Sequence, residues 1–190
     1  YDVLKRVERL MVMRDLALLD GPEEPFFARL TKLASEVIGV PVSLVSFVSN
    51  NYQFFKSSVG LPEPWASNRR TPLSHSFCQH VVGTGQPLVV TDARQHALVK
   101  DNLAVPDLDV IGSKPHNWTE SDIEVMQAFA DLANAEIDAR ARAYHDGVLR
   151  AHIQQSGLFV DSLMQSVQSD TPRANLIAQL ESYTQRLEEN

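Results

Sequence analysis

His75, Cys78 and His80 are the residues whose types and spacing come closest to a reactive centre. Imidazole nitrogen and thiolate sulfur are good ligands for zinc or iron. On a helix, however, positions 75 and 78 share a face while position 80 points elsewhere, and the sequence supplies no fourth ligand. A thiol nucleophile would also need an orienting carboxylate or an oxyanion hole, and neither is found at a recognisable spacing. We therefore predict no metal site and no catalytic residue, with Cys78 a small buried side chain.

Other charged residues also raise the question of a chemical role. Arg69 and Arg70, with Lys56 close in sequence, could meet an anionic ligand, although a solvated surface is the simpler interpretation. His145 and His152 lie on a predicted helix near the C-terminus. Neither is followed by the Glu-Leu-Arg or Asp-Leu-Arg and proline pattern of histidine kinases, so we expect both to face solvent.

Composition excludes several classes of protein. The 190 residues, 44% hydrophobic and 22% charged, are typical of a globular domain with an appendage. A net charge of −7 provides no polycationic surface, which argues against nucleic-acid binding. No apolar run approaches a membrane span and no signal-peptide core is present, so we expect a cytoplasmic protein that does not associate with membranes. One cysteine excludes an internal disulfide.

The first part of the chain predicts the element order ααββαβα. Helical spacing predicts a helix over residues 3–19, and a second helix runs from Glu23 to a stop at Gly39. Residues 40–48 and 52–58 then predict a β-hairpin, and the proline-rich residues 59–73 predict an irregular loop. The remaining elements are a helix over 74–83 with Ser74 as its N-cap, a strand over 87–93 and helical turns over 96–105.

The last 70 or so residues are predicted to be mostly helical. An acidic N-terminus over residues 119–122 opens a long helix, and the apolar repeat persists less cleanly to Val167, with Gly147 and Gly157 as candidate irregularities. A further helix follows Pro172. The repeat that we expect to form a pairing seam consists of Ile123, Met126, Ala130, Ala133, Ile137 and Tyr144.

Several separated sequence blocks resemble bacterial GAF domains. These are Gln-Phe-Phe-Lys-Ser-Ser-Val-Gly-Leu at 53–61, Pro-Leu-Ser-His-Ser-Phe-Cys-Gln-His-Val-Val at 72–82 and Pro-Leu-Val-Val-Thr-Asp-Ala at 87–93. Asn-Leu-Ala-Val at 102–105 and Trp-Thr-Glu-Ser-Asp at 118–122 extend the likeness. The resemblance implies an α/β (α+β) fold, an antiparallel sheet flanked by helices, with long N- and C-terminal signalling helices. It predicts a flanking helix at 1–19, the GAF domain at 20–141 and a helical linker or dimerisation extension at 142–190.

The resemblance also implies a ligand pocket between sheet and helix. The residues that would line it are Gln53, Phe54, Phe55, Ser76, Phe77, Cys78, His80, Asp92 and Asn102. Alternatively, the aromatic residues are ordinary core, Asp92 caps its own turn and Asn102 holds its own loop. The ligand itself stays unknown. A bilin is disfavoured because Gln79 rather than histidine follows Cys78, and haem is similarly weak.

One departure from the family pattern is large. The resemblance implies two further strands, about 25 residues, where Val110 is followed at once by Ile111. Either a stretch of the natural chain is absent from this sequence or the domain is genuinely shortened. We favour the first, because deleting interior strands would leave unpaired backbone groups in the core.

The resemblance predicts a bacterial signal-transduction sensor that is not itself an enzyme. It would form a homodimer through coiled-coil flanking helices and relay the binding of a small molecule or a partner to an output domain such as a kinase, phosphatase or cyclase. Two alternatives stay open. One is a thiol-dependent redox enzyme using Cys78, and the other is a dimerisation scaffold that binds no ligand.

Overall fold

The structure is a computed structural model that describes residues 2–106, 115–168 and 171–189. It divides into two compact units. The first comprises Tyr1–Pro22 and Pro41–Trp118, and the second comprises Glu23–Val40 and Thr119–Asn190. The junction between Val110 and Ile111, where the family pattern would place two further strands, lies outside the described residues.

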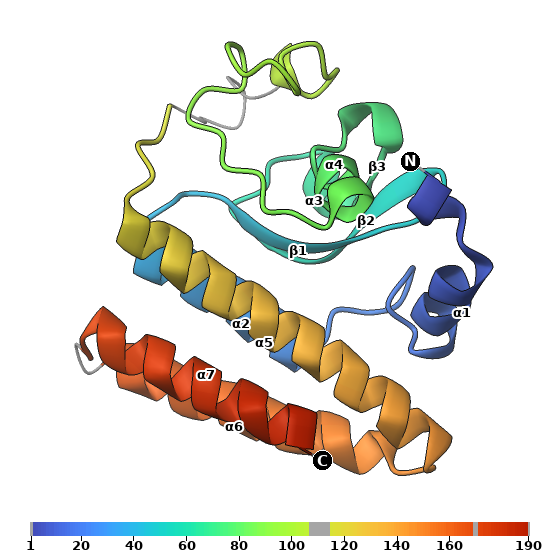
Figure 1. Ribbon diagram of the computed structural model, residues 1–190, viewed down its shortest axis with the longest axis vertical. Helices are drawn as coiled ribbons and strands as arrows, with labels where there is room; N and C mark the ends of the chain where they lie inside the picture. The colour runs from blue at the N-terminus through green and yellow to red at the C-terminus, as the bar shows by residue number, and fades with distance from the viewer. Residues whose placement is uncertain (1, 107–114, 169–170, 190) are drawn as a thin grey trace. The chain divides into compact units, whose positions relative to one another are not determined.

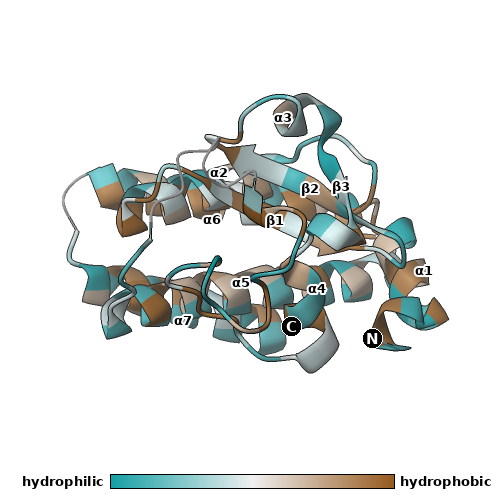
Figure 2. Cartoon of the chain, turned by 90° about the horizontal axis from the view of Figure 1, so that it is seen from above, coloured by the Kyte–Doolittle hydropathy of each residue, from teal (hydrophilic) through white to brown (hydrophobic). Residues whose placement is uncertain are grey.

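The first unit is built on a three-stranded antiparallel sheet in the order β1-β2-β3 (Figure 1). Strands β1 (Ser43–Val48) and β2 (Tyr52–Val59) form the predicted hairpin, which is confirmed. Both strands mix hydrophobic with hydrophilic residues (Figure 2), and the buried hydrophobic ones are Val48, Phe54 and Phe55.

Strand β3 (Arg70–Pro72) and the short helix α3 (Trp65–Asn68) lie in the segment predicted to be an irregular loop, so that prediction was wrong in part. Arg69 adopts a left-handed backbone with φ 51°, which ends α3 and turns the chain back along β2. The backbone N–H of Phe55 donates to the carbonyl of Arg69 at 2.8 Å. Strand β3 forms because it pairs with β2, and the local sequence does not reveal this partner.

The helix predicted over residues 74–83 is shorter and begins later. A 3₁₀ turn, η2 (Leu73–His75), precedes α4 (Cys78–Thr84), so Ser74 is not the N-cap. The hydroxyl of Ser76 instead accepts a hydrogen bond from the backbone N–H of Gln79 at 3.2 Å. The predicted end of the helix is confirmed, because Gly85 has the left-handed φ of 66° that closes it.

Residues 87–93 do not form the predicted strand, whereas residues 96–105 form turns, one of which closes through the helical hydrogen bond from Lys100 N–H to the carbonyl of His96 at 3.0 Å. A strand requires a hydrogen-bonded neighbour. The carbonyl of Thr91 accepts from the backbone N–H of His116 at 3.1 Å, and the carbonyl of Val90 accepts from the indole of Trp118 at 3.1 Å. These isolated contacts tie the segment down without building a ladder.

The N-terminal helix is also shorter than predicted, consisting of η1 (Asp2–Lys5) and α1 (Val7–Asp15). It ends early because Ala17 takes φ 50° and turns its carbonyl toward the ammonium of Lys56, at 2.9 Å. Lys56 is fully buried because it is the extra residue of a bulge in β2, between the pairs Val45–Ser57 and Ser46–Phe55.

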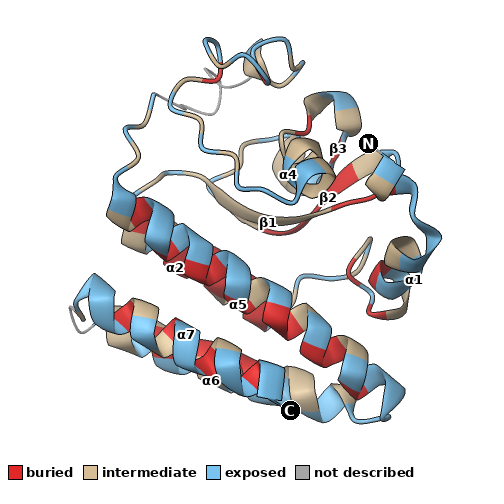
Figure 3. Ribbon diagram, in the orientation of Figure 1, coloured by how far each residue is buried: buried red, intermediate tan, exposed pale blue. Residues whose placement is uncertain are grey.

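The second unit is a bundle of four helices, which lie side by side in Figure 1. They are α2 (Pro25–Ile38), α5 (Glu120–His145), α6 (Leu149–Gln168) and α7 (Arg173–Glu189). Buried residues recur as a stripe along each helix (Figure 3), which is the pattern of a shared apolar core. The predicted start of α5 is confirmed, since Thr119 and Asp122 form a reciprocal capping box.

The continuous helical seam predicted from Ile123 to Val167 does not form, and this expectation was wrong. The chain reverses between α5 and α6, where Gly147 has a φ of 73° that suits glycine, whereas α6 runs through Gly157 without a break. The predicted repeat does not lie on the core-facing side of α5. Its buried residues include Val125, Phe129 and Leu132, while the repeat is exposed or half-buried.

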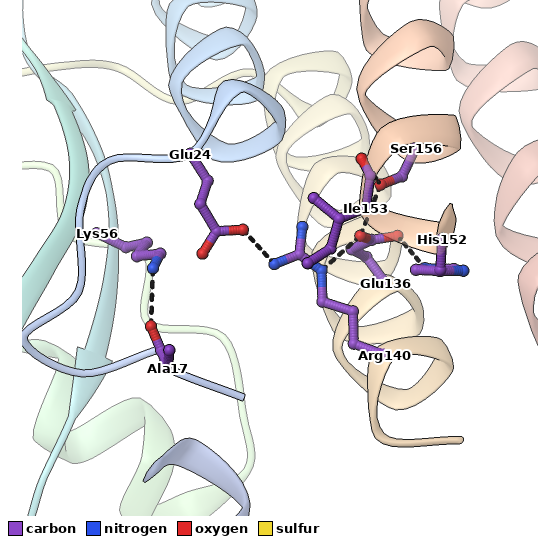
Figure 4. A network of polar contacts seen from close by, with 8 residues as sticks. All are labelled: Ala17, Glu24, Lys56, Glu136, Arg140, His152, Ile153 and Ser156. Atoms are coloured by element: carbon purple, nitrogen blue, oxygen red, sulfur yellow. Dashed lines mark hydrogen bonds and ion pairs between the residues drawn. The ribbon is translucent and has the colours of Figure 1, made fainter. Parts of the chain in front are cut away.

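A polar cluster whose centre, Arg140, Glu136 and Ser156, is buried holds α2, α5 and α6 together (Figure 4). The guanidinium of Arg140 donates to Glu136 at 2.6 Å and also to Glu24 at the start of α2. Glu136 in turn accepts from the hydroxyl of Ser156 at 2.8 Å and lies 3.0 Å from His152 Nε2, both on α6. His152 is therefore not the solvent-facing histidine that we predicted.

Helix α7 joins the bundle through contacts at its start and along its length. At its start Arg173 donates to Asp122 at 2.8 Å, and the hydrogen bonds from Thr119 together with this ion pair lower the pKa of Asp122 to about 2. Further along, Tyr183 stacks on Phe159 of α6 with ring centroids 3.6 Å apart. Burial, with the nearby charge of Glu136, raises the pKa of Tyr183 to about 12.

We predict that Glu136→Gln lowers the free energy of unfolding of the bundle by about 3 kcal/mol, because it leaves Arg140 buried with less than its full countercharge. Urea unfolding followed by far-ultraviolet circular dichroism measures the loss. Asp138→Asn, the same chemical change at an exposed position of α5, should change stability by less than about 0.5 kcal/mol. Equal stability of the two variants would contradict the role given to Glu136.

Candidate functional site

A cavity of about 290 Å³ lies in the first unit between the sheet and the segments that cross it. Its walls come from all three strands, from α3, η2 and α4, and from the turn at Ala104. The lining residues are Leu44, Gln53, Phe55, Leu61, Trp65, Thr71, His75, Phe77, Cys78 and Ala104. Most are aromatic or aliphatic, and none carries a carboxylate, an ammonium or a guanidinium group.

Four of the nine predicted ligand-binding residues line this cavity: Gln53, Phe55, Phe77 and Cys78. Phe54 is not on the lining, because successive side chains of a strand point to opposite faces of the sheet. It is buried and lies under the guanidinium of Arg69, 5.0 Å from the ring centre. The sequence suggested that Phe54 and Phe55 would both line the pocket, whereas the alternation of side chains along β2 places only Phe55 on the lining.

The remaining predicted residues surround the cavity or lie away from its lining. Ser76 is fully buried, and its carbonyl accepts from the amide of Asn102 at 3.2 Å. Asn102 also accepts from the backbone N–H of Ala104 at 2.9 Å, so it shapes its own turn. Asp92 accepts from the backbone N–H of Arg94 at 3.0 Å, and hydrogen bonds from Arg94 lower its pKa. His80 lies on α4, half-buried and off the lining.

Thr71 is the lining residue that sequence reasoning missed and that has the clearest chemical signature. It lies on β3 with 8% of its surface exposed, and its hydroxyl has no hydrogen-bond partner among the described residues. An unsatisfied buried hydroxyl costs about 1–3 kcal/mol. Nothing in the sequence pointed to Thr71, because the segment was predicted to be a loop and the strand that holds it was not foreseen.

Cys78 lines the cavity but is electrostatically unsuited to act as a nucleophile. Burial raises the pKa of its thiol, and the hydrogen bonds from Ser46 and Gln53 only partly oppose this shift. The Gln53 amide nitrogen lies 3.4 Å from Cys78 Sγ, and the Ser46 hydroxyl lies 3.6 Å from it. A raised pKa keeps the thiol protonated at neutral pH, where only the thiolate reacts rapidly.

The basic residues that could have met an anionic ligand are occupied within the protein. Arg69 donates to the carbonyls of Gly21 at 3.2 Å and Lys56 at 2.9 Å, and Arg70 pairs with Asp20 at 2.7 Å. Over residues 2–106, 115–168 and 171–189, no group of three His, Cys, Asp or Glu side chains is arranged to hold a metal ion. No helix in these ranges is long and apolar enough to cross a membrane.

Residues 22–137, more than half of the chain, match the family model of the GAF domain. The chain therefore belongs to the GAF domain family, whose members are generally regulatory rather than catalytic. It is also similar to a cyclic di-GMP phosphodiesterase of Pseudomonas aeruginosa, with 25% identity over 145 residues, covering 64% of this chain. The match covers only 24% of that relative, so the relative's enzymatic activity is not carried over to this chain.

We predict that Cys78 reacts slowly with Ellman's reagent in the native protein at pH 7.5, and at least about tenfold faster once the protein is unfolded, because folding buries the thiol and raises its pKa. The rate of thiolate release, followed by absorbance with and without denaturant, measures the difference. Rapid reaction of the native thiol would contradict this assignment and revive the redox alternative.

Proposed function

We propose that this chain is a non-catalytic sensor domain whose cavity binds a small, uncharged and largely apolar molecule. The observation that supports this most directly is the unpartnered hydroxyl of Thr71, on the lining of a largely apolar cavity of about 290 Å³. A ligand with one polar atom near Thr71 would satisfy that hydroxyl while its apolar body displaces water from the aromatic wall.

The size and charge of the cavity narrow the class of ligand. An enclosure of roughly 150 Å³ accommodates benzene, so this cavity suits a compact single-ring or bicyclic molecule. Phosphate groups are normally recognised by arginine, lysine or a helix N-terminus. The lining carries no such cation, which argues against cyclic di-GMP as the molecule that binds here.

The signal would reach an output domain through the helices. Trp118 directly precedes the N-cap of α5, and its indole donates to the carbonyl of Val90, so we propose that this segment relays ligand binding to α5. In this proposal the ligand favours one of two arrangements of the flanking helices. We propose that the output domain is, for example, a kinase, a phosphatase or a cyclase.

We further propose that the sensor is a homodimer that pairs through the outward face of α5. Met126 and Tyr144 are 38% and 47% exposed, and they lie on a side of α5 that the four-helix bundle does not use. The repeat of three and four residues that links them through Ala130, Ala133 and Ile137 is the spacing of a helix-pairing seam. We also propose a functional division of the chain into a flanking helix at 1–19, a GAF domain at 20–141 and a helical linker or dimerisation extension at 142–190.

The alternatives receive less support. The redox alternative needs a reactive thiolate, whereas burial raises the pKa of Cys78. A ligand-free scaffold would have no use for a cavity whose lining includes an unsatisfied hydroxyl.

The cavity is tested with indole as an uncharged probe, by isothermal titration calorimetry of the whole chain. We expect Thr71→Val to weaken indole binding about tenfold through loss of one hydrogen bond, while leaving the stability of the free protein unchanged or higher. The matched control is Thr31→Val, since Thr31 already donates to Phe27 at 2.7 Å in the bundle.

The control should behave in the opposite way, lowering stability by about 1 kcal/mol without changing indole binding. Native mass spectrometry of freshly purified protein then searches for a retained natural ligand. If Thr71→Val destabilised the free protein and left binding unchanged, the hydroxyl would be structural and the proposed ligand site would lose its main support.

The dimer is tested by sedimentation velocity over a range of protein concentrations. We expect Met126→Glu to raise the dimer dissociation constant at least about tenfold, because it places a charge in an apolar seam. Leu158→Glu, at a position on α6 that is 65% exposed and lies off the seam, should have no such effect. A parent protein that stays monomeric at high concentration would overturn the homodimer.

A further inference from the structure

A long groove runs between α5 and α7 on the outside of the four-helix bundle, with a volume of about 980 Å³. It lies entirely within the second unit. From α5 it is lined by Glu120, Ile123, Glu124, Gln127, Ala128 and Asp131, and from α7 by Ile177, Glu181, Thr184, Gln185 and Glu188. On both helices these residues follow a spacing of three and four, so each helix presents one continuous side of about three turns to the groove.

The charge along the groove is of one sign. Glu120, Glu124 and Asp131 from α5 share it with Glu181 and Glu188 from α7, and no lysine or arginine is on the lining. All five carboxylates are exposed and none has an ion-pair partner among the described residues.

Other acidic residues of the same bundle contrast with these five. Glu24 and Glu136 pair with Arg140, Asp122 pairs with Arg173, and Asp161 pairs with Arg29 at 2.8 Å. The groove therefore keeps like charges together at a cost in repulsion that a cationic partner would relieve.

The floor of the groove is apolar. Ile123 is 38% exposed there, and Ala128 and Ile177 continue the apolar surface from both helices. Thr184 contributes a buried hydroxyl that has no hydrogen-bond partner among the described residues. An apolar floor between two acidic rims is complementary to a helix that has an apolar stripe and flanking positive charges.

We infer that the groove between α5 and α7 is a docking site for a basic amphipathic helix of a partner protein. The carboxylates lie along the groove on both sides instead of converging on one point, which suits several separate cations along an elongated partner. This surface is distinct from the outward seam of α5, with Ile123 at the border between the two. The inference does not depend on the cavity of the first unit.

The groove is tested by fluorescence anisotropy of the whole chain with a labelled synthetic peptide of about 18 residues, built from leucine and lysine so that the leucines form one helical stripe. We expect saturable binding that weakens as the salt concentration rises. Glu124→Lys combined with Glu181→Lys should weaken binding at least about tenfold, because it reverses one charge on each rim.

Two controls separate the groove from general electrostatic attraction. Glu8→Lys combined with Asp101→Lys makes the same change in net charge at exposed positions of the first unit, and should alter binding by less than about twofold. A peptide with serine in place of every leucine keeps the charge and loses the apolar stripe, and should bind at least about tenfold more weakly.

Three results would overturn the inference. They are equal losses of binding in the two double variants, equal binding of the serine and leucine peptides, and absence of saturable binding by the leucine peptide. If the groove substitutions instead changed self-association in sedimentation velocity, the occupant would be a second copy of this chain and the basic partner helix would be abandoned. Far-ultraviolet circular dichroism of each variant confirms that the helices are retained.

Discussion

The helical bundle is organised around Arg140, a guanidinium held 1% exposed in its core. A cation so far from water is tolerated only when carboxylates surround it, and here Glu24 comes from α2 and Glu136 from the preceding turn of α5. Glu136 is itself held by Ser156 of α6. A shift of α2 by one turn would separate Glu24 from Arg140, and a shift of α6 would remove the Ser156 hydroxyl from Glu136, so the cluster favours one alignment of α2, α5 and α6.

This constraint gives the two sides of α5 different roles. Its inward side carries Arg140 and Glu136, together with the apolar residues that pack in the bundle. Its outward side carries Met126 and Tyr144, which the bundle leaves exposed, and its flank carries the acidic rim of the groove. A helix held rigidly on one side can present such surfaces in a defined register, which suits a regulatory domain that communicates with other helices.

The first unit also contains buried polar groups, but their hydrogen-bonding needs are met in a different way. The bulge in β2 buries Lys56, whose ammonium is held by the carbonyl of Ala17. Gly21 allows this approach, because a side chain there would come within 2.7 Å of that carbonyl. In the cavity the hydroxyl of Thr71 is left without such a partner. The unsatisfied hydroxyl of Thr71, in contrast to the satisfied ammonium of Lys56, is what supports the proposal that the cavity binds a ligand.

The sequence by itself determined the family, the hairpin of β1 and β2, the limits of α2 and the capped start of α5, because these depend on local spacing, glycine and capping residues. It also brought Gln53, Phe55, Phe77 and Cys78 together. Only the tertiary structure decided that β3 pairs with β2, that Thr71 faces a cavity and that α6 folds back on α5. Each of these depends on a partner remote in sequence, such as Glu24 for Arg140, and a periodic pattern shows that a helix has an apolar side without showing what covers it.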